Sequence, residues 1–348
     1  MSHHSLLPMS LAAAALLVSS PAPAQYAATA ERTQTIPRGG DGHPDMTGIW
    51  TNITITPLER PKDLANKAFF TPQEAAEYEK QVVTNRNRDR RDRGTERDVA
   101  NAYNDFWWDS GTHVLKNLRT SIIVDPPDGR IPPLTAQRQQ ALAAQAEAIK
   151  KRCEQPGSGC QPENSGILGP ADKASDRPLM ERCISFGTVG PPMMPSAYNN
   201  NYQFVQSPSG LAIDVEMAHD VRRIPFDGGP HLPSTVRQWF GDSRGHWEGD
   251  TLVVDTTNFT GLTNFRGADE NLHVVERFTM TDPNTVLYQF TIDDPTAFTK
   301  PWSGEIPMVR APGPLFEYAC HEGNEGMKGI LSSARAEEEA YEASQKNK

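Results

Sequence analysis

The sequence predicts a mainly β protein with some α-helix, built as an antiparallel up-and-down β-barrel with a helical insertion. From Tyr202 onwards, short runs of β-forming residues recur, and turn residues such as Pro208-Ser209-Gly210 and Gly249-Asp250 separate them. This spacing is typical of an antiparallel meander. An earlier strand precedes residues 63–153, which carry helix signals instead. These observations place a helical insert inside a β domain.

The first 24 residues have the composition of a secretory signal peptide. They contain no Asp, Glu, Lys or Arg, an apolar run from Leu11 to Val18, and the small-residue site Ala22-Pro23-Ala24 before Gln25. The missing positive charge departs from the usual pattern, and a disordered Ala-rich tail is the alternative. No other segment is long and apolar enough to cross a bilayer. We therefore expect an exported protein, periplasmic or secreted, with no membrane span.

Cleavage of 24 residues from 348 would leave 324, which is enough for a domain with a large core. We expect a flexible N-terminal segment at 25–46, a barrel domain at 47–335 with its helical insert at about 63–153, and a charged helical tail at 336–348. The formal net charge of −10 gives no support to nucleic-acid binding. The sequence does not indicate an oligomeric state.

The first elements can be located from their local signals. Ile49, Thr51, Ile53 and Ile55 alternate with other residues, as in a strand. Thr71-Pro72-Gln73-Glu74 combines an N-cap, a proline in the first turn and a capping-box glutamate, so a helix should begin at about Pro72. The Ala/Gln-rich stretch 135–152 predicts a second helix.

The strands of the second half are joined by recognisable turns. Residues 247–255 should form a hairpin that turns at Glu248-Gly249-Asp250. HVVERFTM (273–280) and TVLYQFTI (285–292) should be strands joined by a turn at 281–284. The segments IPMVR (306–310) and LFEYACH (315–321) are further strand candidates.

The four cysteines are even in number, which favours two disulfides in an oxidising compartment. Three connectivities can be drawn. We predict Cys153–Cys160, because these two flank the flexible loop EQPGSG, and this pairing leaves Cys183–Cys320. No CxxC motif is present, so a redox-catalytic role is not favoured.

Several strings resemble known proteins. Gly48-Ile49-Trp50 is similar to the G-x-W that opens the first barrel strand of lipocalins, and the W-x-G-D-T-L-x-V hairpin is also lipocalin-like. The strings GDSRGHWEGDTLVVDTTNF, TIDDPTAFTKPW and YACHEGN resemble those of a large family of exported, mostly uncharacterised bacterial proteins. This resemblance implies a lipocalin-like barrel and export, and it transfers no catalytic residues. The helical insert departs from a minimal lipocalin.

Polar residues on the predicted strands provide the site candidates. If residues 216–223 form one continuous strand, His219 and Arg223 share a face with Met217 and Val221. Inside the barrel, Arg223 could orient an anionic or phenolic ligand. The alternative is a structural salt-bridge network.

Acid–base candidates come from three other strands. Asp255, if it is interior, would be a buried carboxylate that needs a partner, and Glu276 shares its side with the apolar Val274 and Phe278. Glu317 and His321 are four residues apart on one face, and a His–carboxylate pair suits base catalysis. We therefore predict a catalytic set and a ligand-binding set around one pocket. The catalytic set is His219, His321, Glu317, Asp255 and Glu276, and the ligand-binding set is Arg223, Trp239, His246, Trp247 and Trp302.

No metal-binding, P-loop, dinucleotide or serine-hydrolase motif is present, so we expect no cofactor and no metal. Two hypotheses remain. In the first, the barrel is an enzyme of lyase, isomerase or hydrolase type that acts on a small, fairly apolar or aromatic substrate by acid–base chemistry. In the second, it is a non-catalytic lipocalin-like carrier of a small-molecule ligand. A structural envelope protein would leave the polar residues unexplained.

Overall fold

The structure is a computed structural model that describes residues 35–347 except 88, 90–107, 164–165 and 188. The predicted signal peptide and residues 25–34 of the predicted flexible segment lie outside these residues. No helix in the described ranges is long and apolar enough to cross a membrane.

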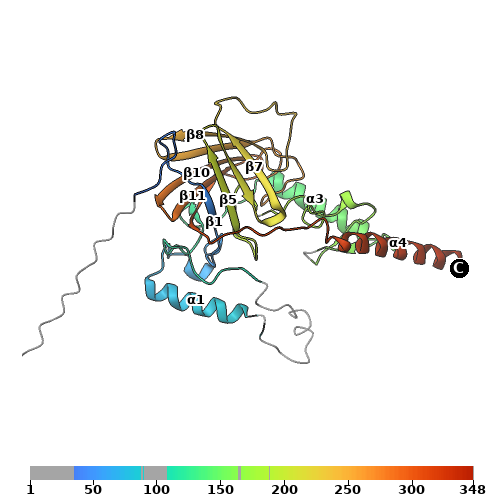
Figure 1. The fold of residues 1–348 in the computed structure, drawn as a ribbon. Coiled ribbons are helices and arrows are strands. Elements are labelled where there is room, and N and C mark those ends of the chain that lie inside the picture. Colours follow the sequence, from blue (N-terminus) through green and yellow to red (C-terminus); the bar gives the residue numbers. More distant parts are fainter. Residues whose placement is uncertain (1–34, 88, 90–107, 164–165, 188, 348) are drawn as a thin grey trace, which may run out of the picture. The chain divides into compact units, whose positions relative to one another are not determined.

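One antiparallel sheet of ten strands curls into a nearly closed barrel (Figure 1). Nine of its strands follow the order β7-β6-β5-β1-β12-β11-β10-β9-β8, and β2 pairs with β12 beside this path. The strands are β1 Gly48–Thr51, β2 Ile123–Asp125, β5 Asn201–Ser207, β6 Gly210–Val215, β7 Asp220–Pro225, β8 Asp242–Glu248, β9 Thr251–Thr257, β10 His273–Asp282, β11 Thr285–Asp293 and β12 Trp302–Arg310.

The first strand closes the sheet between β5 and the last strand, and every other neighbouring pair on the nine-strand path is consecutive. The end strands β7 and β8 lie close together, and Arg222 of β7 donates to the Ser243 hydroxyl of β8 at 3.3 Å. The predicted mainly β, antiparallel barrel with its helical elements is therefore confirmed at this level. Its likeness to a lipocalin stays a prediction.

Side chains fill the interior of the barrel. Successive residues of β10, β11 and β12 alternate between buried and half-buried, because neighbouring side chains point to opposite faces of a sheet. Gly304 lies opposite Phe290, and a Cβ at this glycine would lie 2.3 Å from the phenylalanine ring. The largest interior side chains are almost fully buried: Trp50, Tyr202, Phe204, Phe278, Tyr288, Phe290 and Trp302.

The insert between β1 and β5 begins with a 3-10 helix, η1 (Lys62–Leu64), and an α-helix, α1 (Pro72–Arg86). The predicted capping box is present at α1, where the Thr71 side chain accepts from the Glu74 N–H. Further along are α3 (Ala136–Cys153), β3 (Gln161–Pro162), β4 (Leu168–Gly169) and η3 (Ala174–Asp176). The α3 helix has the predicted N-cap at Thr135, which accepts from the Arg138 N–H at 3.1 Å. The connection between β1 and β5 is longer than the predicted 63–153 insert, and its strand β2 belongs to the barrel sheet.

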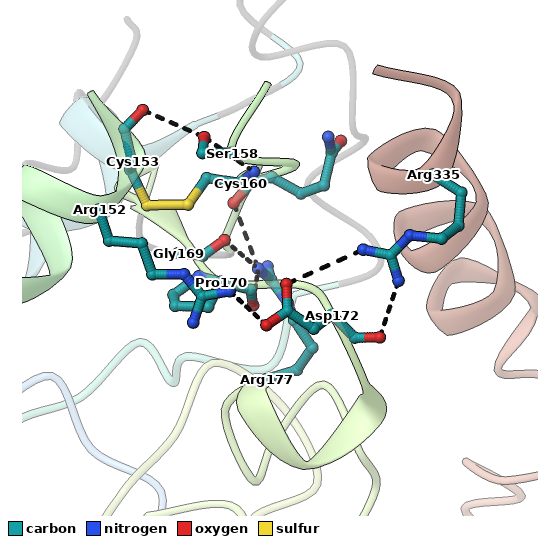
Figure 2. Close-up of a disulfide and its surroundings, with 10 residues drawn as sticks. Arg152, Cys153, Ser158, Cys160, Gly169, Pro170, Asp172, Arg177 and Arg335 are labelled. Atoms are coloured by element: carbon teal, nitrogen blue, oxygen red, sulfur yellow. Dashed lines mark hydrogen bonds and ion pairs between the residues drawn. A yellow bond between two sulfur atoms is a disulfide. The ribbon is translucent and has the colours of Figure 1, made fainter. Parts of the chain in front are cut away.

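Both predicted disulfides are present. Cys153–Cys160 closes the loop after α3, over a sequence separation of 7 (Figure 2). Cys183–Cys320 joins the middle of the chain to the segment after β12, over a separation of 137. Two disulfides fit an oxidising, extracytoplasmic environment.

The region around the first disulfide is organised by Arg177, whose side chain is fully buried. Its guanidinium donates to the backbone carbonyls of Gly169 and Pro170 on one side of the β3–β4 hairpin (Figure 2). It also donates to the carbonyls of Gln161 and Pro162 on β3 and to Glu181, the last at 2.9 Å. Helix α4 (Glu325–Lys346) contacts this region through Arg335, which donates to the Asp172 carbonyl at 2.8 Å. This helix begins eleven residues before the predicted 336–348 tail, because Asn324 caps its N-terminus.

Candidate functional site

The outer face of β9 and β10 carries a hydrogen-bonded Asp–His pair. Val254 and Thr256 point inward and are fully buried, so Asp255 between them points outward. Asp255 lies opposite Val275, and His273, two residues earlier on the same face of β10, is its diagonal neighbour. The Nε2 of His273 lies 2.8 Å from Oδ2 of Asp255.

A second histidine reaches the same carboxylate from the loop between β7 and β8. Nε2 of His231 lies 2.9 Å from Oδ1 of Asp255, and its Nδ1 lies 2.9 Å from Oδ2 of Asp242 on β8. Both ring nitrogens can donate to these carboxylates only when the imidazole is protonated. The four side chains form a continuous hydrogen-bonded row, Asp242–His231–Asp255–His273, which we call the His–Asp row.

Asp255, His273 and Asp242 favour their charged forms. The hydrogen bond that His273 donates to Asp255 raises the pKa of His273 against the opposing effect of burial, and the same bond lowers the pKa of Asp255. Burial alone would raise the pKa of Asp242, but hydrogen bonds from the Leu232 backbone and from His231 outweigh it, so that this pKa is lowered. An ionised Asp255 therefore lies beside a protonated His273 at pH values between their two shifted pKa values.

This arrangement suits proton transfer. When His273 is neutral and donates through Nε2 to Asp255, its lone pair is on Nδ1, and the carboxylate stabilises the imidazolium that forms on protonation. The side chain of His273 is 36% exposed, so the ring is within reach of solvent. Within the described ranges, no group of three His, Cys, Asp or Glu residues is arranged to hold a metal ion.

The row also anchors the β7–β8 loop. The Leu232 N–H donates to Asp242 at 2.9 Å, and the side-chain amide of Asn258 donates to the Leu232 carbonyl at 2.8 Å. Any test of chemistry at the row must therefore separate proton transfer from the fixing of this loop.

Glu276 lies inside the barrel, as its apolar neighbours on β10 predict, and it is fully buried. Its carboxylate accepts two hydrogen bonds from Arg222, at 2.6 and 3.1 Å, and one from the Tyr288 hydroxyl at 2.8 Å. The Tyr288 hydroxyl in turn accepts from the Met193 N–H at 2.9 Å. With these partners, Glu276 belongs to a buried ion-pair network.

The inward arginine of β7 is Arg222, whereas Arg223 and Val221 are exposed. The prediction that Arg223 lines the interior is therefore wrong, because the alternation of inward and outward side chains in β7 is shifted by one residue. A 3-10 turn, η4 (Met217–His219), interrupts the segment, and the alternation restarts at the beginning of β7.

His219 and His321 both act electrostatically on the carboxylate of Asp220, and neither is hydrogen-bonded to it in the described contacts. Burial raises the pKa of Asp220, and the two histidines act against this rise. His219 is exposed and has a left-handed backbone, with φ of 56°. The Nε2 atom of His321 lies 2.8 Å from the carbonyl oxygen of Cys183. Glu317 is exposed, and the described contacts include no hydrogen bond or ion pair between it and His321.

The predicted ligand-binding side chains are dispersed. Trp302 is fully buried in the barrel core, and His246 is exposed, 3.4 Å from Glu248. Trp247 stacks on His43 with ring centroids 4.4 Å apart. Trp239 lies in the loop before β8 and is half-buried. None of them is among the lining residues of the described pocket.

Of the residues in the His–Asp row, Asp255 was predicted from the sequence as a site residue, and His231, His273 and Asp242 were not. His273 could have been found from the pairing of β9 with β10. A register that sets Asp255 opposite Val275 makes His273 a neighbour of Asp255. No local pattern indicates His231, because a long loop carries it to the barrel wall.

Comparison with known proteins adds no relative. No protein-family model matches the chain, and no curated protein and no solved structure matches it.

Proposed function

We propose that this protein is an exported enzyme that transfers a proton on a small, partly apolar or aromatic molecule without a cofactor, with His273 as the acid–base group. The supporting observation is that Asp255 accepts hydrogen bonds from two imidazoles, one of which retains a ring nitrogen for a substrate. The two disulfides support export.

In this proposal, Nδ1 of His273 removes a proton from the substrate or from an attacking water and later returns it. Asp255 fixes the tautomer and stabilises the imidazolium, and His231 with Asp242 holds Asp255 in place. General acid–base catalysis of this kind contributes roughly a hundredfold to ten-thousandfold in rate.

The test compares the wild-type protein with His273→Gln and with the control His246→Gln, which removes an exposed histidine next to Glu248. Each is incubated in D₂O with small-molecule extract of the host's culture, and mass spectrometry follows compounds that are consumed, formed or deuterated. We expect the same changes with wild type and His246→Gln, and at least about a hundredfold slower change with His273→Gln. Equal rates with His273→Gln would refute the proposal.

His231→Gln separates chemistry from loop anchoring. It removes the imidazole between Asp242 and Asp255 but leaves the Asp255–His273 pair. We expect its activity to fall less than that of His273→Gln, whereas a purely structural row predicts that the two variants lose activity and stability in parallel.

The carrier hypothesis is the second candidate, and the described pocket favours it. The pocket has a volume of about 640 Å³, and its lining contains no His, Asp or Glu. Pockets of this size bind small ligands, and without an acid–base group this pocket suits binding without turnover. If a ligand binds and no compound in the assay above is changed by the wild-type protein, the carrier hypothesis replaces the enzymatic one.

A further inference from the structure

The described pocket is assembled from segments that are distant in the sequence. Residues 54–58 after β1, 194–197 before β5 and 264–266 between β9 and β10 provide most of its wall. Ile55, Met194 and Phe265 are at least nine-tenths buried and belong to the apolar part of this wall. The pocket thus offers a small molecule an apolar wall beside a polar one.

Among the described residues that line the pocket, two are charged, and both are arginines, Arg86 and Arg266. The guanidinium of Arg86 donates to the backbone carbonyls of Ser110 and Gly111, at 3.3 and 2.5 Å, and not to a carboxylate. For Arg266, the described residues provide no ion-pair partner. The described lining contains no Asp or Glu to neutralise these two cations, and a bound anion would offset their repulsion.

The backbone around Arg266 is constrained. Phe265 and Ala268 exchange two backbone hydrogen bonds of 3.0 Å, which makes the loop between them very short. Arg266 has φ of 57° in this loop, a conformation that costs free energy for a residue with a long side chain and that clusters at functional sites. The loop therefore holds Arg266 at the pocket in spite of an unfavourable backbone.

The net charge of the whole chain is −10. A pocket whose lining has only positive charges stands out against this background, and a cleft lined by one sign of charge concentrates ligands of the opposite sign. Guanidinium groups match the planar geometry of a carboxylate.

We infer that this pocket binds a small organic carboxylate, whose acidic group contacts Arg86 and Arg266 and whose apolar body lies on Ile55, Met194 and Phe265. The inference does not depend on proton transfer by His273, because the pocket lining includes no member of the His–Asp row.

Isothermal titration calorimetry of the disulfide-bonded full chain tests this, with 4-phenylbutyrate as the probe and its neutral amide as the matched ligand. We expect the carboxylate to bind at least about tenfold more tightly than the amide. Arg266→Gln and Arg86→Gln should each remove most of this preference, and Arg266→Lys should retain part of it. Arg223→Gln, which removes an exposed arginine of β7, should bind as the wild type does.

Equal affinity for acid and amide, unchanged binding by Arg266→Gln, or no saturable binding of the carboxylate at millimolar concentration would each overturn the inference. Thermal melting of every variant shows whether it is folded. His273→Gln should bind the probe as the wild type does, so that failure of this inference is distinguishable from failure of the proposed catalytic role.

Discussion

Replacing Glu276 by Gln removes one negative charge from the barrel interior and keeps the size and shape of the side chain. In the wild-type protein, both carboxylate oxygens accept from Arg222, and one of them also accepts from Tyr288. The Arg222 side chain is 3% exposed and the Glu276 side chain is 0% exposed. The substitution therefore leaves a guanidinium without its counter-ion in the core.

The expected cost is about 3 to 5 kcal/mol of unfolding free energy, the range for a buried pair that loses one partner. The upper part of this range applies here, because Gln keeps one acceptor oxygen where the carboxylate has two, and the hydrogen bond from Arg222 to Ser243 is long at 3.3 Å. The Nε of Arg222 has no protein partner among the described residues.

Urea denaturation, followed by tryptophan fluorescence and by circular dichroism with the disulfides intact, measures the loss. The matched control is Glu248→Gln, which breaks an Arg–Glu contact of 2.7 Å with Arg277 on the surface, where the side chains are 40% and 51% exposed. Water screens the exposed pair, so the control should unfold close to the wild-type midpoint.

Equal losses of stability in Glu276→Gln and Glu248→Gln would contradict the expected cost of an unpaired charge in the core. A second variant tests the cause. Arg222→Met combined with Glu276→Leu removes both charges and should recover most of the loss, because a buried pair contributes little beyond an apolar replacement. If the double variant is as unstable as Glu276→Gln, the unpaired charge is not the cause.

Three further perturbations have definite expected outcomes. Cys183→Ala with Cys320→Ala should lower the unfolding free energy by up to about 5 kcal/mol, since the pair is 137 residues apart. This loss should exceed that caused by replacing both cysteines of the short-loop disulfide, and denaturation under non-reducing conditions measures both losses. Gly304→Ala should cost about 1 to 3 kcal/mol by overpacking, and an unchanged melting temperature would contradict the packing described. Asp255→Asn should lower the pKa of His273 measured by NMR. The Asp255–His273 ion pair should stabilise the protein between the lowered pKa of Asp255 and the raised pKa of His273, which exceeds 6.5. Its contribution is lost as the pH rises through the pKa of His273 and as the pH falls through the pKa of Asp255. A His273 titration unaffected by Asp255→Asn would exclude the pairing.

Local signals predicted several elements correctly, whereas LFEYACH (315–321), predicted as a strand, forms none in the structure. The capping box at Thr71 and the turn at Gly249-Asp250 act within a few residues, so the sequence specifies helix α1 and the β8–β9 hairpin without reference to the rest of the chain. The disulfide pairing could also be predicted, because one pair flanks a short flexible loop.

The parts that could not be predicted depend on register and on tertiary contacts. A single 3-10 turn at 217–219 shifted the phase of β7, which moved Arg222 rather than Arg223 into the core. His231 meets Asp255 only because the loop between β7 and β8 folds back on the barrel wall. The connection from β1 to β5 gave no sign that its short strand β2 would join the barrel.

The pairing of the first strand with the last has a consequence for how the chain folds. Trp50 and Thr51 of β1 are in register with Arg310 and Val309 of β12, so this contact joins residues about 260 positions apart. The β8–β12 meander consists of strands that pair with their neighbours in sequence, so it can assemble early. Closure at β1 requires β12 to be in place and costs the entropy of a very long loop. Until then, the edges of β1 and β12 are unpaired and available to other chains. We therefore expect premature truncation before β12 to yield aggregates rather than a smaller folded domain, and a slow final folding phase to accompany the burial of Trp50.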